Sequence, residues 1–517
     1  MAWGILEDTK LAEVPGTTLL DREPESTQSF EDAILKTKDG VVLVPQPSDS
    51  PNDPYNWSFI KKNVIMITLA LTSGVTTSLG PMISPGLEVA SQMYNVSLDQ
   101  ISSLLIGLFL LVTGSATFFT AASATVWGKR PVFVISAFAL LITNVWGFFS
   151  MNFVSLVVMR IVQGLASAPL ETLVTSTVSD IFFVHERGQK IAIWGVMIAS
   201  GVLLGQVISG YIIESLGFLA TFGVTAIIFV FLVPAIFFLV PETVYIKGKK
   251  LDDYEKDTES INKFELNEPP RPFTSQLRVF NGRLSDESFW RLVIKPLPLV
   301  AFPAVIFSTL VYGSFMTWLV TFGVLSVNVF SSPPYNLNPA QIGLTNIPLL
   351  IVALIANPLS GFVADRISRF MARRNNGIYE PEFRLTLMIP ATIFSTVGFI
   401  GFGVSVSQGA PLAIAIVFMS LHSASVGFAS TASFAYVIDC HPRDANQAFV
   451  TINFMKAVFT FFASLFANGW YTASGPLVVF LTIGIVNLVI SLTTVPMYIF
   501  GKRFRSMVAR SPALNKL

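Results

Sequence analysis

Long apolar runs separated by short polar stretches dominate this 517-residue chain. A run of about twenty apolar residues is long enough to cross the hydrocarbon core of a bilayer as a helix. Such runs begin near Asn63, Asp99, Pro131, Asn152, Gln189, Gly217, Pro298, Gln341, Leu385, Pro411, Gln447 and Pro476. The pattern therefore predicts an all-α membrane protein with twelve transmembrane helices.

A long charged stretch divides the runs six and six. We expect a disordered cytosolic tail over residues 1–60, a six-helix half over 61–240, a cytosolic linker over 241–297, a second six-helix half over 298–500 and a cytosolic tail over 501–517. A weak internal repeat supports the division, because the fourth run ends at Asp180 and the tenth ends at Asp439. Two parallel halves are typical of transporters that bind their substrate near the midplane, between the halves.

Basic residues alternate along the connections and predict the orientation. Lys and Arg follow every even-numbered run, and the short connections after the odd-numbered runs contain neither. The positive-inside rule then places both termini in the cytosol. The sequon at Asn95 falls on the outer side and is a glycosylation candidate. At the start of the tail, Trp3, Ile5 and Leu6 form an amphipathic opening, for which a solvated tail and contact with the membrane surface both remain open.

Composition excludes several other classes. Only 13% of the residues are charged and the net charge is +1, so nothing indicates a nucleic-acid partner. The single cysteine, Cys440, permits no internal disulfide, and the three histidines lack metal-ligand spacing. No phosphate-binding glycine loop or catalytic nucleophile appears. We therefore expect a monomer without cofactor or metal that is not an enzyme.

The fourth run carries a polar stripe. At about 100° per residue, Arg160, Ser167 and Glu171 fall on one helix face, with Arg160 and Glu171 about 16 Å apart along the axis. A charge near mid-membrane costs roughly 2.5–3.5 kcal/mol, so these side chains must face a partner or a wet cavity. A path for a polar solute or a proton would use such a stripe.

Several motifs resemble the major facilitator superfamily. Gly361, Asp365 and Arg366 match the loop signature after the eighth span, whereas Gly128, Lys129 and Arg130 match only part of it after the second. Arg160, Gln163 and Gly164 match the signature of the fourth span. The antiporter signature of the fifth span survives as Gly201, Gly205 and Gly210, with Gln206 at a proline position.

Finer motifs resemble the fungal twelve-span drug:proton antiporters, and within them a branch of permeases for histidinol and polyamines. These motifs are residues 53–58 before the first span, 241–243 after the sixth and 375–385 before the ninth. The resemblance implies a proton-coupled carrier of small molecules.

We expect proton coupling and substrate binding to involve Arg160, Gln163, Glu171, Gln206, His422, Tyr312 and Trp318. Burial raises the pKa of a carboxyl group and a bound cation lowers it, so a proton and a cationic substrate would compete for Glu171. An arginine stays protonated and can only steer such a group. Each side chain also has a structural alternative: Arg160 could cap carbonyls, Glu171 and His422 could bond nearby hydroxyls, and the aromatic residues could pack in the core. We expect Lys456 to reach toward the cytosolic surface.

Residues at the cytosolic ends of the spans are assigned to gating. Asp180, Asp365, Arg366, Asp439 and Arg130 could hold the two halves together in the outward-facing state.

The combined prediction is a proton-coupled efflux transporter for small cationic or amphipathic compounds. Its partners would be the solute, protons and the lipid bilayer, and its location the plasma membrane, with the vacuolar membrane left open. Proton-coupled uptake of polyamines and a non-transporting membrane sensor are the alternatives.

Overall fold

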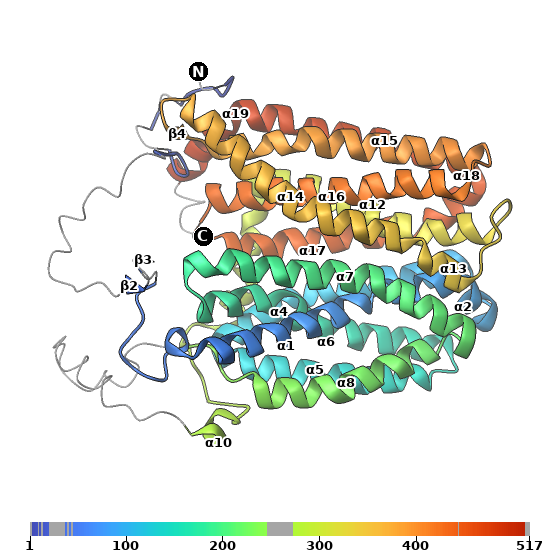
Figure 1. The fold of residues 1–517 in the computed structure, drawn as a ribbon, viewed down its shortest axis with the longest axis horizontal. Helices are drawn as coiled ribbons and strands as arrows, with labels where there is room; N and C mark the ends of the chain where they lie inside the picture. The colour runs from blue at the N-terminus through green and yellow to red at the C-terminus, as the bar shows by residue number, and fades with distance from the viewer. Residues whose placement is uncertain are drawn as a thin grey trace.

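The computed structural model describes residues 3–8, 10–11, 14–19, 37–38, 41–42, 45–245, 272–442 and 444–511. These residues form a bundle whose long helices run along the longest axis of the molecule (Figure 1). Trp3 and the last helix lie at the same end, since Tyr498 donates a hydrogen bond to the carbonyl of Trp3 at 3.1 Å. We call this end the terminal face and the other end the opposite face.

The first half contains eleven elements between residues 54 and 239. They are η1 (Pro54–Asn56), α1 (Phe59–Ser78), η2 (Pro81–Gly86), α2 (Leu87–Tyr94), α3 (Leu98–Ser102), the π-turn η3 (Ser103–Gly107), α4 (Leu108–Trp127), α5 (Lys129–Phe148), α6 (Phe153–Ile181), α7 (Val184–Leu216) and α8 (Ala220–Leu239). In the described part of the connecting segment, α10 (Phe273–Gln276), α11 (Phe289–Ile294) and η4 (Leu297–Ala301) follow.

The second half repeats this organisation. Its elements are α12 (Pro303–Ser331), α13 (Pro339–Leu344), α14 (Asn346–Arg373), η5 (Pro381–Leu387), α15 (Met388–Ser407), α16 (Leu412–Cys440), α17 (Ala445–Ser464), α18 (Ala467–Leu492) and α19 (Thr494–Arg510). Two short antiparallel pairs accompany the helices: β1 (Thr18–Leu19) with β4 (Ile378–Tyr379), and β2 (Thr37–Lys38) with β3 (Val41–Val42).

Within the described residues, eleven helical segments are long and apolar enough to cross a membrane. They cover every predicted run except the one near Gln447, which forms the 20-residue helix α17. Asn446, Gln447, Asn453 and Lys456 reduce the hydropathy of α17. The structure therefore confirms an all-helical bundle of membrane-spanning segments, and the twelfth span stays a prediction.

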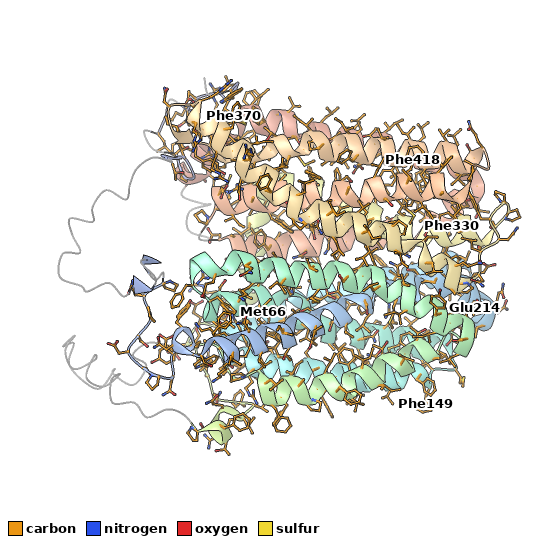
Figure 2. The ribbon with its side chains drawn as sticks, in the orientation of Figure 1. Met66, Phe149, Glu214, Phe330, Phe370 and Phe418 are labelled. Carbon is orange, nitrogen blue, oxygen red and sulfur yellow. The ribbon has the colours of Figure 1, made fainter. Side chains whose placement is uncertain are left out.

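The outer surface of the bundle is apolar. On α5, Ile135, Phe138 and Ile142 are each at least half exposed and recur every three to four residues, which is the spacing of one helix face. Phe149, at the opposite face, is 69% exposed, whereas Phe330 is fully buried (Figure 2). Such a surface is stable in lipid and not in water.

The two halves meet along two helix pairings. Helix α4 packs against α17, and α7 packs against α13 and α14. Glycines allow these approaches: a Cβ on Gly114 would lie 2.6 Å from the Cβ of Ala457, and one on Gly210 would lie 2.6 Å from the carbonyl oxygen of Pro339. The interface therefore requires small residues at these crossings.

Two of the corresponding helix pairs have equal lengths, which supports the internal repeat. Helices α5 and α15 each have 20 residues, and α6 and α16 each have 29. Asp180 and Asp439 are both the penultimate residue of their helix, and Gln163 and His422 occupy the same position in theirs. In the second of these helix pairs, equivalent positions therefore carry the residues that suggested the repeat.

Part of the segment that we expected to be disordered is folded. In the described portion of residues 3–19, Ile5 is fully buried beside Met371 and Phe383 of the second half. Lys502 donates to Glu7 at 2.6 Å, and Ser506 donates to Asp8 at 2.6 Å. The apolar residues at the start of the chain therefore pack against the second half (Figure 1).

Candidate functional site

Arg160 lies fully buried in the first half, where its guanidinium donates to backbone carbonyls. The acceptors are Leu105 at 2.7 Å, Leu79 at 2.8 Å and Gly80 at 3.3 Å, and Gln163 Oε1 accepts at 2.7 Å. The guanidinium also lies 4.4 Å from the ring centroid of Phe109. Arg160 thus connects the end of α1 and the π-helical segment η3 to α6. This is the structural role, the capping of carbonyls, that we gave as the alternative to proton coupling.

Gln163 extends this network away from the interface between the halves. Its amide donates to Asn144 Oδ1 at 3.2 Å, and Asn144 donates to the carbonyl of Leu140 at 2.7 Å. All these groups are buried. In this conformation, Arg160 and Gln163 hold helices together and do not contact Glu171.

Glu171 is different, because its side chain has no hydrogen-bond or ion-pair partner among the described residues and remains partly exposed. On α6, the large apolar residues exposed on the outer surface are Val154, Val158, Val162 and Leu165. At about 100° per residue, Glu171 lies well over 90° around the helix from that face and shares the face of Arg160. The space next to the carboxylate is therefore inside the bundle. The neighbouring hydroxyl of Thr172 donates instead to the carbonyl of Ala168 at 2.7 Å.

A cation from the other half lies within electrostatic range of Glu171. Lys456 on α17 interacts electrostatically with its carboxylate. The ammonium donates to Asn453 Oδ1 at 3.2 Å and lies 5.7 Å from the ring centroid of Tyr312. Our expectation that Lys456 reaches the cytosolic surface is therefore wrong: it sits in the middle of α17, and inside the bundle a carboxylate and an aromatic ring stabilise its charge.

Tyr312 lies against this lysine. Its ring centroid is 4.5 Å from that of Phe434, and its side chain is only slightly exposed. We expected Tyr312 to stack against a cationic substrate; here the cation nearest to its ring is Lys456. Glu171, Lys456, Tyr312 and Phe434 thus come from both halves, and we call them the charged aromatic group.

His422 and two other predicted residues lie away from this group. His422 is fully buried, with Nδ1 3.2 Å from Ser395 Oγ and its ring 4.3 Å from that of Phe399. Gln206 donates to the carbonyl of Val202 at 3.2 Å and lies near Gly323 of the second half. The indole N–H of Trp318 is buried without a hydrogen-bond partner in the described residues, as is Nε2 of His422.

The acidic residues predicted to gate the terminal face form ion pairs within each half. Lys129 Nζ lies 2.6 Å from Asp180, and Thr243 donates to the same carboxylate at 3.0 Å. In the second half, Arg384 lies 2.6 Å from Asp439 and 3.4 Å from Asp365. None of these contacts joins the two halves in this conformation.

The two predicted gating arginines differ. The guanidinium of Arg130 is buried and donates to the carbonyls of Phe237, Val240, Leu277 and Arg278, which closes the end of α8. Arg366 is exposed on α14. Sequence reasoning recognised the motif residues but not which partner each would take.

A contact that the sequence did not reveal joins the halves at the opposite face. The carboxylate of Asp99 accepts hydrogen bonds from the backbone N–H groups of Asn468 and Gly469, both at 2.8 Å. These groups begin α18, where unpaired N–H groups and the helix dipole favour an anion. The side-chain amide of Asn468 also donates to Ser102 at 3.2 Å. We call this the Asp99 contact. Its only sequence signal was an acid at the start of the second run.

Loss of the Asp99 contact should open the opposite face. We expect Asp99→Asn to increase labelling of a cysteine placed at Asn328, which lines a small cavity there, by about five- to tenfold, because two hydrogen bonds lose their charged acceptor. A membrane-impermeant maleimide on intact cells would measure the rate in a Cys440→Ser background. Glu214→Gln, which changes an exposed acid on the same face that does not line this cavity, is the matched control. Equal labelling in both variants would contradict this prediction.

Asn95 is exposed at the opposite face. It ends α2 in a left-handed conformation with φ of 53°. Ser97 of the same sequon begins α3, where its hydroxyl accepts from the backbone N–H of Gln100 at 3.3 Å. Glycosylation at Asn95 stays a prediction.

Paired helices, an internal repeat and charged side chains from both halves are typical of secondary transporters. The family model of the Major Facilitator Superfamily matches residues 65–464, and the chain belongs to this superfamily. It is thus a multi-pass membrane transporter and not an enzyme.

Fungal relatives match along nearly the whole length. An uncharacterized MFS-type transporter of Schizosaccharomyces pombe is 26% identical over 97% of this chain and 94% of its own. Protein HOL1 of Saccharomyces cerevisiae is 24% identical over 96% of each chain. Other, more distant fungal relatives are named efflux pumps. The resemblance to a fungal branch of the superfamily is confirmed.

A solved structure shares the fold. The D-xylose-proton symporter superposes with a TM-score of 0.62 at 15% sequence identity, covering 86% of this chain and 99% of that one. At this identity the likeness supports the architecture and carries no information about the substrate.

Proposed function

We propose that this protein is a proton-coupled secondary transporter that exports small organic cations or amphipathic compounds. In the proposed arrangement, all twelve predicted helices cross the plasma membrane and the terminal face lies in the cytosol. The alternation of basic connections supports that orientation. The names of the more distant relatives support the direction.

The observation that carries the proposal is the charged aromatic group. Glu171 is an acid inside the bundle that is partly exposed and has no hydrogen-bond or ion-pair partner in the described part of the chain. A proton and an organic cation would each neutralise it, so binding of one disfavours the other. Each unit by which the cation lowers the pKa corresponds to about 1.4 kcal/mol of coupling between the two ligands.

Lys456 would take part in the exchange of a proton for a cationic substrate at Glu171. In the absence of a ligand, its ammonium partly balances the charge of Glu171. A cationic substrate next to Tyr312 and Phe434 would repel Lys456 and take over both the carboxylate and the aromatic surface. Since Glu171 and Lys456 belong to different halves, exchange of the cation changes the attraction between the halves.

Transport by the purified full-length chain in proteoliposomes tests the proposal. With an acidic lumen, we expect tetraphenylphosphonium to accumulate in the vesicles while the lumen becomes alkaline, because each cation that enters releases protons. Spermidine in a parallel assay tests the polyamine alternative. Cation movement that acidifies the lumen would indicate symport and contradict the proposal. No flux of either probe, with or without a pH gradient, would favour the sensor.

A further inference from the structure

A cavity of about 320 Å³ opens at the terminal face, away from the charged aromatic group. Its walls come from the start of α1, the start of α5, the end of α8 and the connecting helix α10. In Figure 1, α10 lies beyond the end of α8, at the lower edge of the bundle. The cavity thus lies where membrane-spanning helices emerge toward the aqueous phase.

The outer rim of the cavity is apolar and exposed. Val64, Phe238, Leu239 and Phe273 are between 37% and 59% exposed. Val64, Phe238 and Leu239 belong to helices that span the membrane, so acyl chains cover them in a bilayer. Phe273 lies on α10, and Trp290, 64% exposed, follows on α11. Aromatic residues of this kind are enriched at the membrane interface, which places the connecting segment at headgroup level.

The inner wall of the cavity is cationic. Lys61 is half-buried, donates to Gln276 Oε1 at 2.9 Å and lies 3.9 Å from the ring centroid of Trp57. No carboxylate forms an ion pair with Lys61 in the described part of the chain. Arg130 also lines the cavity, and its guanidinium donates to backbone carbonyls.

None of the described residues that line this space is acidic. The nearest carboxylate partner of the region, Glu242, accepts from the backbone N–H groups of Lys129 and Arg130, each at 3.0 Å. The cavity therefore combines two cations, one of them with free donor capacity, and an apolar exit into the bilayer.

We propose that this cavity binds the headgroup of an anionic phospholipid from the leaflet at the terminal face. Its phosphate would accept hydrogen bonds from the Lys61 ammonium, in the positive potential of Arg130. Its acyl chains would lie over Val64, Phe238 and Leu239. Basic pockets between membrane helices recognise anionic headgroups through this combination of charge and apolar surface.

The same lipid would connect two parts of the chain. Lys61 belongs to the first membrane helix, and its partner Gln276 belongs to the connecting segment. A phosphate bound at Lys61 would accept a second hydrogen bond from the ammonium that already donates to Gln276, where α1 meets the connecting segment. The inference requires that the chain crosses a bilayer and is independent of the transported solute, so its failure would leave the proposed function standing.

Lipid retention by the full-length protein tests the inference. The protein is purified in detergent micelles that contain equal amounts of phosphatidylserine and phosphatidylcholine, and the bound lipids are counted by native mass spectrometry. We expect phosphatidylserine to be preferred, and Lys61→Gln to reduce that preference about fivefold, the contribution of one basic residue near an anionic surface. Lys61→Arg, which keeps the charge, should restore it.

The matched control is Arg291→Gln. Arg291 is an exposed cation of α11 in the same connecting segment that does not line the cavity, so its removal should leave the preference unchanged. Equal preference in wild type and Lys61→Gln would overturn the inference. Displacement of phosphatidylserine by millimolar inorganic phosphate would show a site for free anions and would also overturn it.

Discussion

Glu171→Gln should abolish accumulation of an organic cation driven by a pH gradient. Glutamine has nearly the same shape but neither binds a proton nor carries a charge, so the competition between proton and cation is lost. We expect the initial rate of gradient-driven tetraphenylphosphonium accumulation in proteoliposomes to fall at least about tenfold, equivalent to about 1.4 kcal/mol of lost coupling.

A second acidic residue serves as the control, because its substitution removes a negative charge without affecting the proposed coupling between proton and cation. Glu214 is exposed near the end of α7 at the opposite face and has no role in the charged aromatic group (Figure 2). Glu214→Gln should transport at the wild-type rate. Undiminished proton-driven accumulation by Glu171→Gln would remove this residue from the mechanism, while the superfamily fold would be unaffected.

Arg160→Met should destabilise the fold. Methionine fills similar space but leaves the carbonyls of Leu79, Gly80 and Leu105 without their donor in a buried site. Removal of one partner from a buried charged network costs about 3–5 kcal/mol. We therefore expect a clear fall in the thermal midpoint, of at least about 5 °C.

The lone cysteine provides the measurement. Cys440 is buried, so a thiol-reactive fluorogenic dye reports its exposure as the protein unfolds in detergent. Arg366→Met, which removes an exposed arginine, should leave the midpoint unchanged. A folded Arg160→Met variant with an unchanged midpoint and no transport would contradict the structural interpretation and support a direct role of Arg160 in coupling.

Much of the architecture could be predicted from hydropathy alone. A membrane-spanning helix must bond its own backbone and present apolar side chains to lipid, so its sequence pattern is strong and local. The repeat was also visible, because Asp180 and Asp439 mark equivalent helix ends. Helix α17 shows the limit: Asn453 and Lys456 in its middle bond each other inside the bundle, so the helix is less apolar than a span exposed to lipid.

The site was only partly predictable, because its contacts join residues far apart in the sequence. Glu171 stood out as a charge in an apolar run, but nothing local indicated that Lys456 would lie within electrostatic range of it. The carboxylate of Asp99 accepts hydrogen bonds at the start of α18, but the N-terminus of any other helix could equally have bound it, so the sequence did not indicate which one would. Likewise, Ile5 is an ordinary apolar residue until Met371 and Phe383 surround it.

The contact between the N-terminal residues and the second half has a practical consequence for measuring conformational change in this protein. Residues 3–8 are fastened to the second half, although the next helix along the chain, α1, belongs to the first. A fluorescent reporter fused ahead of Met1 would therefore travel with α19 and not with α1. Paired with a dye near Lys190 on α7, it would report any movement of one half against the other as a change in energy transfer.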